Sequence, residues 1–137
     1  MTNFFLDTNV LIDFLCDRKP FADDAARLFH ASLKKKVKLF VSAVSYNNIY
    51  YILRQQNTHA QCLQILVSLN EWTEVLDTTK DVIHKSLHSG FNDFEDAIQY
   101  ATAMSKNNMR CIVTRNTKDY KKSLLPIMTP GEALKLI

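Results

Sequence analysis

Residues 4–15 read FFLDTNVLIDFL. The apolar run Phe4–Leu6 predicts a short buried strand, and the apolar spacing from Val10 to Leu15 predicts a helix directly after it. Asp7 stands between them, at the carboxyl end of the strand. The stretch therefore predicts a strand–helix unit with an acidic residue at its junction.

The rest of the chain alternates in the same way. Apolar runs predict strands at 37–41, near 72–76, at 111–113 and at 127–128, and helical spacing predicts helices over 25–33, 44–53, 60–69, 82–87, 94–104 and after Pro130. Strands separated by helices are typical of a parallel sheet covered on both faces. We expect an α/β fold: a three-layer α/β/α sandwich whose central, mainly parallel sheet has about four or five strands.

Length and composition limit the class of protein. The 137 residues, with only 2 Gly and 3 Pro, predict a single domain over residues 1–137 without a linker. No apolar stretch is long enough to span a membrane, and the amino terminus lacks an export signal, so we expect a cytoplasmic protein. The three cysteines, Cys16, Cys62 and Cys111, lie far apart, which favours reduced, buried thiols over disulfides or zinc.

The net charge of +3 neither requires nor excludes a nucleic-acid partner. One basic run contains Lys34, Lys35, Lys36 and Lys38, and a second, near the carboxyl terminus, contains Arg110, Arg115, Lys118, Lys121 and Lys122. Each run fits either a solvated surface or contacts to a phosphate backbone. In the second, Arg115 and Lys118 stand beside Asn116, where they could neutralise phosphates, and we expect the same of Arg18.

Acidic and amide side chains follow the predicted strands at their carboxyl ends. Asp7 follows the first strand, Asn116 and Asp119 follow the strand at 111–113, and Asp93, Glu95 and Asp96 begin the helix near 94. Ligands of parallel α/β sheets bind beyond this edge, where the strand order reverses. Crowded carboxylates repel one another, and oxygen donors without thiolate or imidazole select Mg²⁺ or Mn²⁺.

Each of these acids also has a structural interpretation. Asp7 and Asp93 could cap the helices that follow them, because Asp is a favoured N-cap residue. The helix dipole would favour Asp96 in a first turn without any metal. Asp119 could brace the turn before Tyr120. Glu95 is expected to point about 100° away from Asp96 around the helix, either next to the metal ligands without binding the ion or in solvent.

Four segments, in order along almost the whole chain, resemble those of PIN-domain nucleases. They are FLDTNVLI at 5–12, DFEDAIQYATA at 93–103, IVTRNTKDY at 112–120 and PGEAL at 130–134. The resemblance implies that Asp7 and Asp96 are the principal metal-binding acids, and that Asn116 and Asp119 contribute a further acid or amide. It departs in the segment around residue 48, where the family usually has Glu and this chain has Asn48.

The departure resembles a PIN subgroup that lacks this Glu and carries an extra acid before the third one. Asp93 would be that acid, and we hypothesise that Asp93, as a third metal ligand, restores the negative charge missing at Asn48. The catalytic set is then Asp7, Asp93, Asp96, Asn116 and Asp119. Asn48 is uncharged, but its amide can still accept a metal or orient water.

The resemblance implies a Mg²⁺- or Mn²⁺-dependent endoribonuclease that cuts single-stranded RNA. It also implies a homodimer and, for many small bacterial members of the VapC type, a toxin held by an inhibitory antitoxin. Asn48 keeps a second interpretation open, an RNA- or protein-binding module that has lost catalysis. A phosphoryl-accepting receiver domain is disfavoured, because the first strand offers Asp7 alone and no Asp follows the strand at 37–41.

Overall fold

The computed structural model describes residues 1–137, and its centre is a sheet of five strands in the order β3-β2-β1-β4-β5. The strands are β1 (Thr2–Leu6), β2 (Val37–Ser42), β3 (Glu74–Leu76), β4 (Met109–Val113) and β5 (Ile127–Met128). Every neighbouring pair runs parallel. The five parallel strands confirm the predicted fold class.

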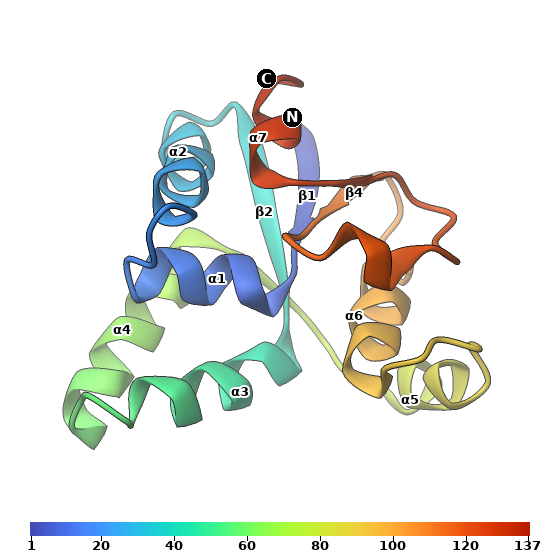
Figure 1. The fold of residues 1–137 in the computed structure, drawn as a ribbon, viewed down its shortest axis with the longest axis horizontal. Coiled ribbons are helices and arrows are strands. Elements are labelled where there is room, and N and C mark those ends of the chain that lie inside the picture. The colour runs from blue at the N-terminus through green and yellow to red at the C-terminus, as the bar shows by residue number, and fades with distance from the viewer.

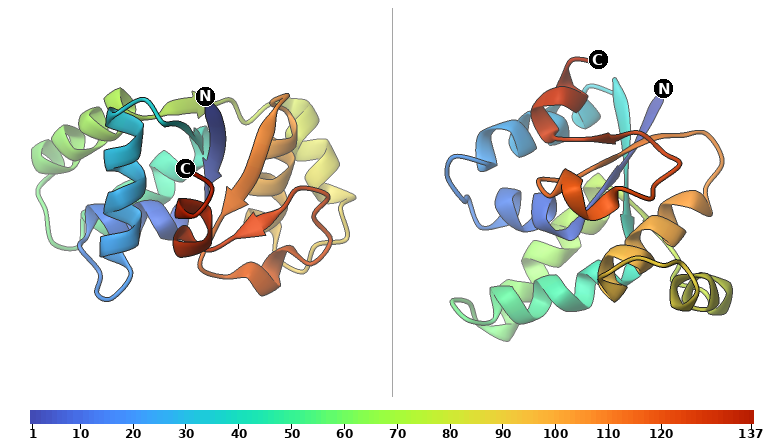
Figure 2. Two further views of the ribbon diagram at one scale, coloured as in Figure 1. Left: turned by 90° about the horizontal axis from the view of Figure 1, so that it is seen from above. Right: turned by 45° about the vertical axis from the view of Figure 1, so that its right-hand side comes forward.

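Helices cover both faces of this sheet (Figures 1 and 2). They are α1 (Thr8–Leu15), α2 (Ala22–Leu33), α3 (Ala43–Leu53), α4 (His59–Trp72), α5 (Lys80–Leu87), α6 (Phe94–Met104) and α7 (Pro130–Leu134), with a short 3₁₀ helix, η1 (Thr117–Tyr120), between β4 and β5. Helices α1 to α4 lie on one side of the sheet and α5 and α6 on the other (Figure 1). The result is the expected three-layer sandwich.

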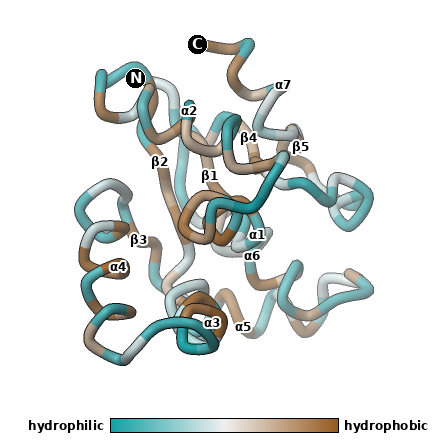
Figure 3. The backbone as a smooth tube through the Cα atoms, turned by 60° about the vertical axis from the view of Figure 1, so that its left-hand side comes forward, coloured by the Kyte–Doolittle hydropathy of each residue, from teal (hydrophilic) through white to brown (hydrophobic).

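The central strands bury side chains on both faces because successive residues of a strand point in opposite directions. In β1, Phe4 and Leu6 join a large apolar cluster with α1 to α4, whereas Phe5 joins a smaller one with Ala103 of α6 and Tyr120 of η1. Colouring by hydropathy shows hydrophobic residues along the inner strands and hydrophilic residues in many of the connecting turns (Figure 3). Burial on both faces is why these strands read as continuous apolar runs.

The strand order reverses beside β1, which positions the candidate site. Strands β2 and β3 follow β1 in order on one side of it, and β4 and β5 lie on its other side. The carboxyl ends of β1 and β4 therefore lie side by side, with Leu6 in register with Val113. The run Lys34–Lys36 precedes β2 and so lies at the opposite end of the sheet.

Two details differ from the sequence predictions. The strand expected near 72–76 begins at Glu74, because Trp72 ends α4 and its ring contacts Phe14 and Phe29 at centroid distances of 5.9 and 6.2 Å. Cys62 and Cys111 are buried as expected, but Cys16 is exposed, because it caps the end of α1 where the chain turns into solvent.

None of the helices is both long and apolar enough to cross a membrane.

Candidate functional site

An open acidic cleft of about 330 Å³ lies beyond the carboxyl ends of β1 and β4. It is lined by 12 residues: Asp7, Thr8, Asn9, Ile12, Arg18, Asn48, Ile52, Asp93, Glu95, Asp96, Asn116 and Asp119. Five of these side chains are carboxylates, three are amides and one is a guanidinium. Sequence segments from all over the chain therefore meet here, and they bring a strong excess of negative charge.

Asp7 is the most firmly held of the acids. It is the N-cap of α1, and its Oδ1 accepts hydrogen bonds from the Thr8 backbone N (2.7 Å) and from Gln99 Nε2 (3.3 Å). Its Oδ2 accepts from the hydroxyls of Thr114 (2.9 Å) and Tyr120 (3.1 Å). The side chain is both a helix cap and a buried, oriented carboxylate at the floor of the cleft.

The amino terminus of α6 supplies three further acids. Asp93 is the N-cap, and its Oδ1 accepts a hydrogen bond from the backbone N of Asp96 at 3.0 Å. Glu95 and Asp96 occupy the first turn. Both line the cleft together with Asp93.

Glu95 is exposed and lies beside the other cleft acids, as the sequence interpretation allowed. It lines the cleft and accepts a hydrogen bond from Asn48 Nδ2 at 3.1 Å. Angular separation on a helical wheel does not keep it out, because the cleft lies beyond the end of α6 and first-turn side chains on different faces can reach it. The uncharged Asn48 is thus paired with a carboxylate, and Glu95 as well as Asp93 adds charge near it.

Burial and repulsion between charges raise the pKa of Asp7, Glu95 and Asp96. Burial, followed by the charges of Asp7, Asp93, Asp119 and Glu95, raises the pKa of Asp96 to about 7. Burial also raises the pKa of Asp7, although its four hydrogen bonds oppose the shift. The pKa of Glu95 is raised by burial and by the nearby charges of Asp7 and Asp93. A bound cation would offset the repulsion between these carboxylates, because a nearby positive charge favours their ionised form.

The donors in the cleft fit a hard divalent cation in type. They are carboxylate and amide oxygens without thiolate or imidazole, the set that suits Mg²⁺ or Mn²⁺. No three of the chain's Asp, Glu, His and Cys side chains lie close enough together to hold an ion as they stand. Asp96 makes no side-chain hydrogen bond and Asp119 is exposed, so both can rotate toward the fixed Asp7.

The fourth segment reaches the cleft through the turn after β4. The Asn116 backbone N donates to Thr114 Oγ1 at 3.1 Å, and Asn9 Nδ2 donates to the same hydroxyl at 3.2 Å. Thr114 in turn donates to Asp7, so one hydroxyl joins the ends of β1 and β4. Asn116 and Asp119 both line the cleft.

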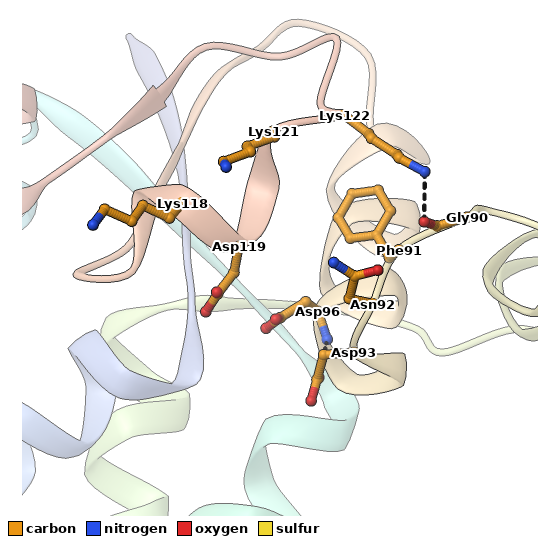
Figure 4. Close-up of a pocket in the computed structure, with 9 residues that line it drawn as sticks. All are labelled: Gly90, Phe91, Asn92, Asp93, Asp96, Lys118, Asp119, Lys121 and Lys122. Atoms are coloured by element: carbon orange, nitrogen blue, oxygen red, sulfur yellow. Dashed lines mark hydrogen bonds between the residues drawn. The ribbon is translucent and has the colours of Figure 1, made fainter.

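The three basic residues expected to meet phosphates lie in different places. Arg18 lines the cleft, and Lys118 lines an adjoining pocket that shares Asp119 with it (Figure 4). Arg115 lies outside both. Its Nε and Nη2 bond the buried Asp13 at 2.5 and 3.2 Å, and its guanidinium lies 4.1 Å from the centroid of the Phe21 ring.

Buried polar residues beneath the cleft were missed by the sequence reasoning. Gln99 is fully buried, and its Nε2 donates to Thr8 Oγ1 (2.7 Å) and Ser45 Oγ (3.1 Å) besides Asp7. The Tyr120 hydroxyl bonds Asp7 from the other side. A signal for Gln99 was present, because it is a polar residue within the apolar stripe of the 94–104 helix.

Comparison with known proteins places this fold in a family. Residues 3–118 match the family model described as PIN domain. Among solved structures, a toxin–antitoxin complex from Klebsiella pneumoniae is similar with a TM-score of 0.69 at 22% identity, over 92% of this chain and 96% of that one. VapBC2 from Rickettsia felis, bound to a DNA fragment from its promoter, has a TM-score of 0.65 at 15% identity, over 93% and 97% of the two chains.

A third similar structure is VapC20 from Mycobacterium tuberculosis, a toxin that cleaves the sarcin–ricin loop. Its TM-score is 0.63 at 17% identity, over 80% of this chain and 86% of that one. At such identities the likeness to the three structures establishes the fold. No curated protein matches the chain in sequence.

Proposed function

We propose that this chain, which belongs to the PIN domain family, is a Mg²⁺- or Mn²⁺-dependent endoribonuclease that hydrolyses phosphodiester bonds of single-stranded RNA. PIN domains are generally nucleases that use divalent metal ions, and the chain has the acids such chemistry needs. The observation that carries the proposal is the convergence of five carboxylates in one cleft at the reversal of strand order. A structural cap at Asp7 or Asp93 alone would not require that convergence.

In this proposal Asp7 and Asp96 are the principal ligands of the ion, and Asp93 supports them. Asp7 is oriented by its four hydrogen bonds before any ion binds. Asn116 and Asp119 approach from the opposite side, on the turn after β4 and on η1. A bound divalent ion would supply Lewis acidity, lowering the pKa of a water molecule and offsetting phosphate charge.

Asp96 must lose its proton to act as a ligand. Because its pKa is about 7 in the metal-free chain, the ion competes with a proton below that pH. Metal affinity, and with it activity, should rise as the pH increases through 7.

Water is the proposed nucleophile, because the cleft offers no activated side chain. Its lining contains no Ser, Cys or His, and its one hydroxyl, that of Thr8, is engaged by Ser45 (2.8 Å) and Gln99. At the rim of the cleft, Asn48 donates a hydrogen bond to Glu95. Their hydrogen bond supports a role in positioning water or ion rather than in covalent chemistry.

The proposed RNA contacts follow the positions of the cations. Arg18 borders the acidic cleft and Lys118 the adjoining pocket, so both can reach phosphates of a strand lying there. Arg115 is committed to Asp13 and Phe21. We therefore assign Arg115 to bracing the turn that carries Asn116, and not to direct phosphate binding.

We also propose that the chain is the toxin of a toxin–antitoxin pair, acts in the cytoplasm and forms a homodimer. This rests on the family and on the structural neighbours, one of which is a toxin–antitoxin complex and another a toxin. Co-expression with the product of an adjacent reading frame tests it. Relief of growth arrest and co-purification would support the proposal, and growth unaffected by the chain alone would contradict it.

A cleavage assay tests the nuclease. The purified chain is incubated with a mixed pool of single-stranded RNA in Mg²⁺, Mn²⁺ or EDTA, beside Asp7→Asn and Asp96→Asn. Asp23→Asn, an exposed change on α2, is the charge-matched control. We expect cleavage that requires the ion, disappears in both cleft variants and persists in the control. RNA that is bound but left intact by the wild type would instead support the non-catalytic binding module.

A further inference from the structure

A second pocket, of about 160 Å³, adjoins the acidic cleft, and of its lysines only Lys118 has been given a role above, as a contact to RNA phosphates. It is lined by nine residues: Gly90, Phe91, Asn92, Asp93, Asp96, Lys118, Asp119, Lys121 and Lys122. Three of them, Asp93, Asp96 and Asp119, also line the cleft. The two hollows therefore share a boundary, and the pocket adds to these aspartates a lysine wall formed by Lys118, Lys121 and Lys122. In Figure 4 the Lys122 side chain extends toward Gly90, and those of Lys118 and Lys121 extend the other way.

The lysines of this wall are not neutralised by contact ion pairs. None of Lys118, Lys121 and Lys122 is among the chain's salt bridges, although three aspartates line the same pocket. Lys122 Nζ donates one hydrogen bond, of 2.7 Å, to the neutral carbonyl of Gly90. Each ammonium group has three donors, so most of the wall's donors remain free for a ligand.

The position of Lys122 is fixed by the backbone around it. Gly90 has a φ of +75°, which an L side chain rarely adopts, and a Cβ there would lie 2.9 Å from Lys122 Nζ. Leu124 N donates to Tyr100 Oη at 3.1 Å. These contacts tie the segment that carries Lys121 and Lys122 to α6 and to the loop before it.

Phe91, the one aromatic residue of the pocket, is held by two ring contacts. The ring of Phe91 stacks on Tyr100 at a centroid distance of 5.1 Å and meets Tyr120 edge-on at 6.0 Å. Tyr120 is the residue that donates to Asp7. The pocket and the acidic cleft are thus connected through packed side chains, from Phe91 to Tyr120 and from Tyr120 to Asp7.

We infer that this pocket binds the backbone phosphate next to the scissile one, with Lys121 and Lys122 as the groups that hold it. The inference rests on the proposed function, because it takes the ligand to be the strand that enters the acidic cleft. Such a strand would cross Asp96 and Asp119, where the ion offsets its charge, and then reach free ammonium groups. Since a phosphodiester carries a full negative charge, it complements the lysines and not the bare carboxylates.

The lysines could instead only reduce repulsion among the neighbouring aspartates. In that case removing them would strengthen the binding of a divalent cation and leave RNA binding unchanged, because the ion would be the sole counter-charge. The two roles therefore differ in what they predict for RNA: removing the lysines weakens RNA binding if they hold a phosphate and leaves it unchanged if they only reduce repulsion.

The test measures binding of a short, unstructured, fluorescein-labelled oligouridylate by anisotropy in Mg²⁺. The background is Asp96→Asn, which is expected not to cut the probe. Two changes are added, Lys121→Met alone and Lys121→Met with Lys122→Met. Lys121 makes no hydrogen bond or ion pair, so the single variant keeps the fold intact even if loss of the Gly90 contact perturbs the double one.

The control is Lys34→Met with Lys36→Met, which removes the same charge from two exposed positions at the other end of the sheet. We expect the Kd of the double pocket variant to rise about tenfold and its log–log salt slope to become shallower by about 0.7, the value for one phosphate of a single strand. The single variant should show part of both effects. The control should show neither.

Equal Kd and equal salt slope in the pocket and control variants would overturn the inference. A parallel cleavage assay separates it from the proposed function. Wild-type cleavage with unchanged RNA binding in the pocket variants would retain the nuclease and remove the subsite. Failure of the wild type to cleave any RNA, with the Kd still raised in the pocket variants, would retain the subsite and remove the nuclease.

Discussion

Replacing Asp96 with Asn should stabilise the metal-free protein at alkaline pH. The pKa of Asp96 is about 7 in the fold, against an ordinary value of 3.8, and it is raised first by burial and then by the charges of Asp7, Asp93, Asp119 and Glu95. Between about pH 4 and pH 7 the folded chain keeps this proton and the unfolded chain does not. The free energy of unfolding therefore falls as the pH rises through this range, and the full penalty remains above pH 7.

The size of the effect follows from the shift. A change of about three units corresponds to about 4 kcal/mol, and we halve this because Asp96 is only partly buried and solvent screens its neighbours. Asp96→Asn should then be roughly 2 kcal/mol more stable than wild type in EDTA at pH 8. For a chain of this length that is a gain in Tm of roughly 7 °C. Since Asp96 accepts no side-chain hydrogen bond, the amide breaks none.

Thermal unfolding in EDTA at pH 5 and pH 8 measures this directly. The advantage of Asp96→Asn should shrink at pH 5, where the folded wild type is protonated, and saturating Mg²⁺ at pH 8 should raise the Tm of the wild type alone. Asp23→Asn, which is exposed, should match the wild type throughout. A wild type as stable at pH 8 as at pH 5, with no gain in Asp96→Asn, would refute the reasoning.

Three further predictions concern the surroundings of the cleft. Arg115→Met should lower the free energy of unfolding by about 3 kcal/mol in urea titrations, because it leaves the buried carboxylate of Asp13 without its partner; a change below about 1 kcal/mol would contradict this. Asp93→Asn should weaken Mg²⁺ binding in calorimetric titrations, and an unchanged affinity would remove Asp93 from the ion's surroundings. Gly90→Ala should cost about 1 kcal/mol at a positive φ and displace Lys122, so a Tm equal to that of the wild type would count against the fixed position of that lysine.

The sequence was sufficient for the architecture because the buried strands and the helical stripes leave direct periodic signals. Phe4–Leu6 and Cys111–Val113 are apolar throughout because each strand is covered on both faces. The alternation of strands and helices then fixed the parallel topology. Trp72 was misplaced since a large apolar side chain fits the end of a helix as well as the start of a strand.

The site was predictable in part, for a different reason. The acids that follow strands, Asp7 and Asp119, could be located because parallel strands deliver their carboxyl ends to one edge. The hydrogen bond between Glu95 and Asn48 could not, since a helical wheel describes the sides of α6 and the cleft lies off its end. The hydrogen bonds of Gln99 and the ion pair of Arg115 depend on residues far away in sequence, which no local pattern reveals.

The central claim is that the acidic cleft holds a divalent ion between Asp7 and Asp96. Crystals grown with Mn²⁺ at a pH above 7 and measured at the manganese absorption edge test it most directly. The account predicts an anomalous peak within ligating distance of carboxylate oxygens of both residues, and no peak in crystals of Asp96→Asn. A cleft without a peak, in a protein that still cleaves RNA in Mn²⁺, would contradict it.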